Sequence, residues 1–191
     1  MHEAKAENRI TFRRLAQRVR VAVGFLLIPL LFLAARPTAR SIVIGLAISF
    51  IGLFIRAWAS GYLKKNQELT VTGPYAFTRN PLYLGTFIMA TGVAVSTRAW
   101  WFVAVFIALY LLIYIPVMWA EAETLNELFP GEYAPYRERV PMFLPRLLPY
   151  REDRREGRFA LSQYLKHREY RAAIGILVIY TLLAAEMMVL Q

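Results

Sequence analysis

The chain has 191 residues, of which 58% are hydrophobic and 19% are charged, and its formal net charge is +10. The hydrophobic share exceeds the roughly 45–50% of a soluble domain and is concentrated in blocks, which argues against an ordinary soluble globule. The basic residues lie between these blocks, which favours a bilayer with anionic headgroups over nucleic acid as the partner. The absence of cysteine excludes disulfides and thiolate sites, and two histidines are too few for a histidine cluster, so we expect no metal site.

Five apolar runs approach or reach the length of about 20 residues that a helix needs to cross a bilayer. They cover residues 19–35, 41–63, 81–97, 100–120 and 172–190. Core helices of a soluble protein are the alternative, but so many runs in a short chain would require a very large core. The pattern predicts an all-α integral membrane protein with about five transmembrane helices. The third run is short, so we expect it to be tilted or tightly paired.

The predicted organisation is a single membrane domain over residues 1–191. Its parts are a basic arm (1–18), four spans (19–120), a polar segment (121–150), a basic interfacial helix (151–171) and a fifth span (172–190). The last polar stretch interleaves basic and apolar residues, as amphipathic helices on anionic lipid do. Nothing in the sequence indicates the oligomeric state.

The basic residues alternate between the two sides of the predicted spans. Nineteen lie in the N-terminal arm together with Arg20 just after it, in 64–80 and in 121–171, whereas only Arg36, Arg40 and Arg98 lie on the other side. Cytoplasmic loops carry the excess of Lys and Arg. We therefore expect the N-terminus and both polar segments in the cytoplasm, and the C-terminus on the opposite side.

The polar segment 69–85 contains a Gly-Pro turn followed by Arg79, Asn80 and Pro81. Asn is a good N-cap and Pro is favoured at the first helical position, so this predicts the start of a helix. A helix N-terminus beside an arginine suits an anionic group such as a carboxylate. A plain junction between a loop and a helix is the alternative.

The polar segment 121–145 begins as a continuation of the fourth span, which Pro130 and Gly131 end. Tyr133 and Tyr136 then fall on one face of a short helix, which stops before Pro141. Glu121 lies within a turn of the membrane edge, where a carboxylate is costly unless paired. Arg137 or Arg139 is the expected partner, and a solvated, charge-rich helix is the alternative.

Together the two segments resemble a known family. GPYAFTRNPLYLG is similar to the G-P-Y-x-x-x-R-H-P-x-Y-x-G motif of the isoprenylcysteine carboxyl methyltransferase and phospholipid methyltransferase superfamily. EAETLNELFPGEYAPYRERVPMFLP is similar to its second motif, E-E-x-x-L followed by Y-x-x-Y-x-x-R-V-P-x-x-x-P. The resemblance covers residues 69–145, about 40% of the chain. Two positions depart from the pattern, because Asn80 replaces the histidine and Ala122 replaces the second glutamate.

The resemblance implies a methyltransferase that uses S-adenosylmethionine, with its cofactor pocket at the cytoplasmic end of the spans. The cofactor-binding residues implied by the motifs are Gly73, Pro74, Tyr75, Arg79, Asn80, Pro81, Tyr83, Gly85, Leu125, Tyr133 and Tyr136. The implied catalytic residues are Glu121, which would hold the cofactor's amino group or orient the acceptor, and Arg139 or Arg137, which would hold an acceptor carboxylate or phosphate. The implied acceptor is lipophilic and resident in the membrane: an isoprenylcysteine-like carboxylate of a prenylated molecule, or a phospholipid-like amine.

Two other functions stay open at this point. Membrane sterol and steroid reductases share an N-P-x-Y-x-G pattern and bind NADPH, and a relative that kept the fold without catalysis is the third alternative. Arg56 interrupts the second span, where it either snorkels to the interface or faces the pocket. Gly45 and Ser49, small residues at spacing four, predict close helix packing.

Overall fold

The computed structural model describes residues 23–64, 68–151 and 157–190, and every regular element among them is helical. In chain order, these are Val23–Ala34, α2 (Ala39–Tyr62), the 3-10 turn η1 (Gly73–Ala76), α3 (Pro81–Ser96), α4 (Trp100–Leu128), α5 (Tyr133–Arg139), α6 (Leu161–Lys166) and α7 (Tyr170–Val189). The basic arm 1–18 and the start of the first predicted span lie outside the described residues. The all-helical prediction is confirmed.

Three helices, α2, α4 and α7, are long and apolar enough to cross a membrane, with 24, 29 and 20 residues. The helix Val23–Ala34 and α3 are apolar but shorter. Large apolar side chains such as Phe50, Phe54, Leu112 and Leu177 are exposed on the outside of the bundle. Apolar residues facing outward suit lipid rather than water.

The helices α2 and α3 are in backbone contact, which four glycines permit. A Cβ atom at Gly52 would overlap the backbone of Met89, and one at Gly92 would overlap the carbonyl of Gly45. Ser49 on the same face of α2 donates a hydrogen bond to the Met89 carbonyl at 2.8 Å. The predicted close packing through Gly45 and Ser49 is therefore confirmed, and it explains how the short α3 is held.

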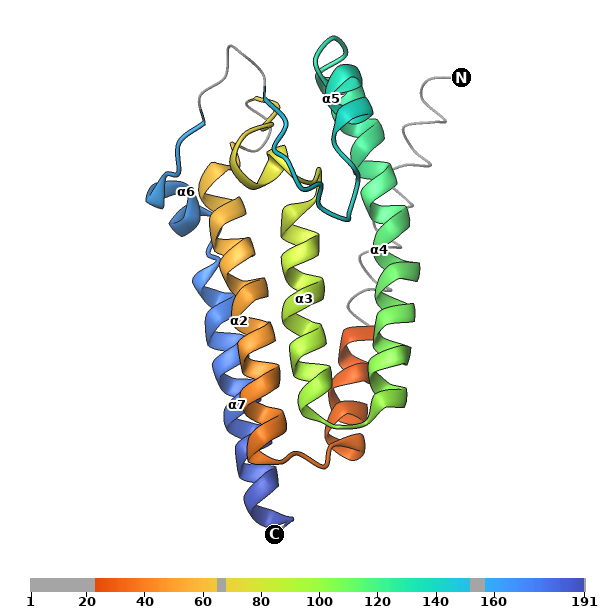
Figure 1. Ribbon diagram of the computed structural model, residues 1–191, viewed down its shortest axis with the longest axis vertical. Coiled ribbons are helices and arrows are strands. Elements are labelled where there is room, and N and C mark those ends of the chain that lie inside the picture. The colour runs from red at the N-terminus through yellow and green to blue at the C-terminus, as the bar shows by residue number, and fades with distance from the viewer. Residues whose placement is uncertain (1–22, 65–67, 152–156, 191) are drawn as a thin grey trace.

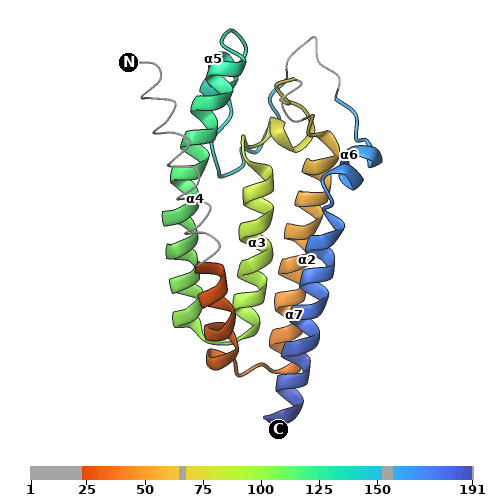
Figure 2. The same ribbon diagram turned by 180° about the vertical axis from the view of Figure 1, so that it is seen from behind.

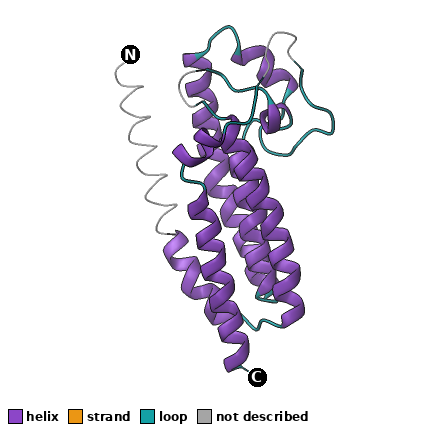
Figure 3. Ribbon diagram, turned by 90° about the vertical axis from the view of Figure 1, so that its left-hand side faces the viewer, coloured by secondary structure: helices purple, strands orange, loops and turns teal. Residues whose placement is uncertain are grey.

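The helix α7 packs along α2, although the two are far apart in the sequence (Figures 1 and 2). The Tyr180 hydroxyl lies 2.9 Å from Ser49 Oγ and accepts a hydrogen bond from Ser96 Oγ at 3.3 Å. These contacts join α2, α3 and α7. Figure 3 shows the long helices side by side, with most of the loop segments at one end and the C-terminus at the other, and Figure 1 places α5 and α6 at the loop-rich end.

The prediction of a helix over 151–171 is wrong in its extent. Only α6, six residues long, is helical between Arg151 and the start of α7, and residues 152–156 lie outside the described residues. The segment before α6 bonds to α2 instead: the Ala160 N–H donates to the Gly61 carbonyl at 2.9 Å, and the Phe159 ring packs against Tyr62. These tertiary contacts replace the hydrogen bonds of a continuous helix.

Candidate functional site

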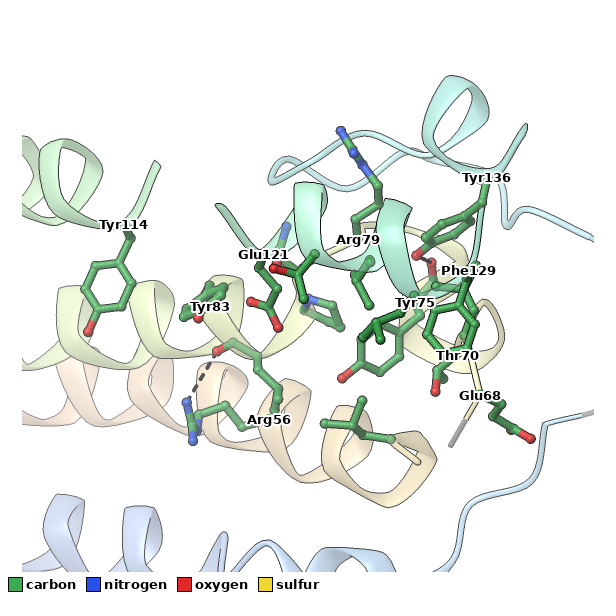
Figure 4. Close-up of a pocket in the computed structure, with 18 of the residues that line it drawn as sticks. Arg56, Glu68, Thr70, Tyr75, Arg79, Tyr83, Tyr114, Glu121, Phe129 and Tyr136 are labelled. Carbon is green, nitrogen blue, oxygen red and sulfur yellow. Dashed lines mark hydrogen bonds between the residues drawn. The ribbon is translucent and has the colours of Figure 1, made fainter. Parts of the chain in front are cut away.

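A cavity of about 470 Å³ lies at the end of the bundle where α2 and α4 stop (Figure 4). Both sequence motifs contribute to its wall. The predicted site residues that line it are Tyr75, Arg79, Asn80, Pro81, Tyr83, Glu121, Leu125 and Tyr136. The structure thus brings together side chains that are up to 61 residues apart in the chain.

Asn80 occupies the predicted N-cap position of α3, but its side chain makes no capping hydrogen bond. Its Nδ2 group donates to the Met142 carbonyl at 2.9 Å instead. The neighbouring Arg79 N–H donates to the Pro141 carbonyl at 2.9 Å. Asn80 therefore ties the first motif to the tail of the second, and the expected capping role is wrong.

Further hydrogen bonds join the two motif tails. Thr78 Oγ1 donates to the Phe143 carbonyl at 2.9 Å, and the Arg146 N–H donates to the Phe77 carbonyl at 2.9 Å. The Tyr150 N–H donates to the Ala76 carbonyl at 2.8 Å. Backbone groups of an irregular segment need partners when buried. Here each motif supplies partners for the other, which positions both around the cavity.

The buried face of α5 carries Tyr133 and Tyr136, with Val140 following at its end, as the spacing predicts. The Tyr136 hydroxyl donates to the Tyr75 carbonyl at 2.8 Å. Arg79 Nη1 donates to the Tyr133 hydroxyl at 2.9 Å, so Tyr133 lies behind Arg79 and outside the cavity wall. The tyrosines of α5 therefore hold the first motif in place.

Burial keeps the phenols of Tyr75 and Tyr136 protonated. Desolvation raises the pKa of the Tyr75 phenol above its usual range, and the negative charge of Glu121 raises it further. Desolvation likewise raises the pKa of Tyr136, with Tyr133 adding to the effect. Both phenols are therefore neutral at ordinary pH and serve as aromatic surface and hydrogen-bond donors.

Glu121 projects from α4 into the cavity between Tyr83 and Tyr75 (Figure 4). Its expected partners, Arg137 and Arg139, are exposed and do not line the cavity. Within the described part of the chain, neither forms an ion pair with Glu121, so the predicted pairing is wrong. The reason is the face of α5 that is buried: its tyrosines point inward, which turns both arginines toward solvent.

Three glycine and proline positions of the first motif shape the backbone instead of lining the cavity. Gly73 has a φ of +60° and lies against the Tyr62 ring, which only glycine accommodates without strain. Pro74 is buried in the same turn. Gly85 lies under the Gly52 carbonyl and the Arg56 side chain, where a Cβ atom would come within 2.8 Å of that carbonyl.

The cavity also contains side chains that the motifs do not include. Arg56 lines the cavity, which settles its two sequence-based alternatives in favour of the pocket, and Thr86 and Tyr114 are further lining residues. The Tyr114 ring contacts Tyr83, with ring centroids 5.4 Å apart. Arg56 was detectable as a charge inside a span. Thr86 and Tyr114 carry no such signal, because each looks like an ordinary span residue.

The sequence model of the phospholipid methyltransferase family matches residues 20–132. A nickel-cobalt-cadmium resistance protein, NccN, of Alcaligenes xylosoxydans xylosoxydans is 32% identical over 65% of this chain and 54% of its own length. A cobalt-zinc-cadmium resistance protein, CzcN, of Cupriavidus metallidurans is 33% identical over 70% of this chain and 65% of its own length. The chain thus spans between half and two thirds of these relatives. No solved structure matches it.

Proposed function

Because the chain belongs to the phospholipid methyltransferase family, we propose that it transfers a methyl group from S-adenosylmethionine to a lipophilic acceptor resident in the membrane. The observation that carries the proposal is the cavity that combines the Glu121 carboxylate with tyrosines of both motifs at the end of apolar helices. The acceptor class is an isoprenylcysteine-like carboxylate or a phospholipid-like amine.

The residues of the cavity suit the cofactor. Its volume of about 470 Å³ falls within the range of small-molecule sites. The cofactor supplies an electrophilic methyl group on a cationic sulfonium. Tyr75, Tyr83 and Tyr114 offer aromatic faces that attract a cation or stack on a flat ring. Glu121 offers a carboxylate for the cofactor's amino group, and the first turn of α3 with Arg79 offers donors for its carboxylate.

The chain's own residues supply orientation and electrostatics. Glu121 sits where the C-terminal part of α4 meets the first motif, so it can hold an amino group or accept a proton from an amine acceptor. Arg56 and Tyr114 lie on α2 and α4, which are long enough to cross a membrane, and Thr86 lies on the shorter α3. On this proposal the polar end of the acceptor meets these three side chains. Positioning of this kind is a large part of catalysis when a nucleophile attacks a bound methyl group.

The test is a titration of the detergent-purified protein with S-adenosylmethionine, its demethylated product and NADPH, followed by calorimetry. We expect the sulfonium cofactor and its product to bind and NADPH not to bind. Glu121→Gln should weaken cofactor binding about tenfold, since a hydrogen bond to a charged group is lost. Glu138→Gln is the matched control, because Glu138 is exposed on α5 and outside the cavity.

The alternatives give different results in the same titration. Binding of NADPH alone would overturn the proposal in favour of a membrane reductase. Failure of all three compounds to bind would support a relative without catalysis. Cofactor binding that Glu121→Gln and Glu138→Gln leave equally intact would remove Glu121 from the site while keeping the methyltransferase.

A further inference from the structure

Arg56 is a charged residue on a membrane-spanning helix, and its donors are nearly all used. Its Nε donates to Glu169 Oε2 at 3.0 Å and its Nη2 to Glu169 Oε1 at 2.9 Å. Its Nη1 donates to the Leu82 carbonyl at 3.3 Å and to Thr86 Oγ1. The two charged side chains are only 20% and 10% exposed, so this ion pair is largely shielded from water.

Glu169 comes from a part of the chain that the family match does not include. It lies 113 residues after Arg56 and precedes α7, whereas the match ends at residue 132. Although Glu169 occupies the N-cap position of α7, its side chain does not cap that helix. The preceding Arg168 has a φ of 55°, a left-handed conformation that turns the chain between α6 and α7. This turn brings the Glu169 carboxylate within hydrogen-bond distance of Arg56.

The charges around the cavity show what this pair does. Four charged residues line the wall: Arg56, Glu68, Arg79 and Glu121. Glu68 is paired with Lys64 at 3.1 Å. The Arg79 guanidinium points away from Glu121 (Figure 4), and its Nη1 donates to the Tyr133 hydroxyl. Among the described residues that line the cavity, the cations are Arg56 and Arg79, and Glu169 neutralises Arg56.

We infer that Glu169 is a positioning and specificity-determining residue of the site, which neutralises Arg56 so that the cavity accepts a ligand with a positive charge. The inference rests on the proposed function. Arg56 itself lines the cavity, and the Arg56–Glu169 pair lies close enough to act electrostatically on Tyr75, another lining residue. Without Glu169, the free charge of Arg56 opposes a cationic ligand and competes for Glu121.

The test compares S-adenosylmethionine, which carries a sulfonium charge, with its demethylated product, which has a neutral thioether in the same place. Both are titrated into Glu169→Gln, Arg56→Gln and the double variant, with calorimetry as the readout. Glu169→Gln should weaken binding of the sulfonium relative to the thioether about tenfold, the size expected of one unit charge in a partly shielded site. Arg56→Gln should shift the same ratio the opposite way, and the double variant should restore it.

A role limited to structure predicts something else: both ligands weaken together, and the ratio of their affinities stays that of the wild type in all three variants. That result overturns the inference. If Glu169→Gln alone does not fold, the double variant and Glu169→Asp replace it, because removing both charges avoids an unpaired buried ion. In that case the inference is overturned if the ratio of the two affinities stays that of the wild type in both the double variant and Arg56→Gln. It is supported if Arg56→Gln shifts the ratio in favour of the sulfonium. A wild-type protein that binds neither ligand overturns the proposed function, and this inference with it.

Discussion

At the scale of single residues, the hydrogen bond from Tyr136 to the Tyr75 carbonyl illustrates how the site is held. The bond is 2.8 Å long and buried, and it joins the second motif to the turn that opens the first. An unsatisfied buried carbonyl costs about 1–3 kcal/mol. The hydroxyl of Tyr136 therefore matters for the position of Tyr75, which also lines the cavity.

Tyr136→Phe should lower the free energy of unfolding by about 1 kcal/mol at neutral pH, because the Tyr75 carbonyl loses its donor. The measurement is thermal unfolding in detergent. Tyr170→Phe is the control, since Tyr170 is exposed at the start of α7. Equal stability of the two variants would show that the hydrogen bond contributes nothing.

The stability of the protein should also fall at high pH for a definite reason. Burial raises the pKa of Tyr75 and Tyr136 above the ordinary value of about 10. Above that pH, the unfolded chain loses protons that the folded chain keeps, so the free energy of unfolding decreases as the pH rises. Tyr136→Phe should reduce the steepness of this decrease between about pH 10 and 12, and an unchanged slope would contradict the assignment.

At the scale of the elements, α2 and α3 are locked by the glycines at their contact. Because the backbones touch at Gly45, Gly52, Gly85 and Gly92, the short α3 keeps a fixed height against α2. The start of α3 carries the cavity residues Pro81 and Tyr83, while α2 carries Arg56. The glycine contact therefore sets the distance between the two walls of the cavity.

Gly52→Ala should destabilise the bundle by about 1–3 kcal/mol, the usual cost of inserting volume into a packed contact. A shift in the thermal unfolding midpoint and in the elution profile of the purified protein would report it. Gly175→Ala on α7 is the matched control, because no heavy atom lies within 4 Å of its Cβ position. Alanine there should be neutral or slightly stabilising, and equal effects of the two substitutions would argue against a backbone contact.

At the scale of the whole molecule, both motifs gather at one end of the bundle, and the C-terminus lies at the other (Figures 1 and 3). Between the motif-bearing end and the C-terminus, the chain therefore runs the length of the bundle an odd number of times. The charge pattern predicts that the motif-bearing end is cytoplasmic.

A topology experiment checks this prediction. In a bacterial inner membrane, alkaline phosphatase fused after residue 191 should be active, whereas green fluorescent protein at the same position should be dark. The same reporters placed in the loop near residue 130 should give the reverse pattern. Fluorescence from the C-terminal fusion would overturn the predicted orientation.

Local patterns in the sequence were enough to predict the helical segments, the end of α4 near Pro130 and the buried face of α5. Each of these depends on neighbouring residues: the length of an apolar run, a helix breaker, or the spacing of Tyr133 and Tyr136. The motif resemblance likewise indicated most of the cavity wall, because the motifs are themselves local.

Only the tertiary structure decided which side chains meet. It gave Asn80 the Met142 carbonyl as a partner, turned Arg137 and Arg139 toward solvent, and paired Arg56 with Glu169. The physical reason is that these contacts join segments 62 to 113 residues apart or depend on which face of a short helix is buried. Periodicity and composition constrain a segment's own conformation, whereas the partner of a buried charge is chosen by the packing of the whole bundle.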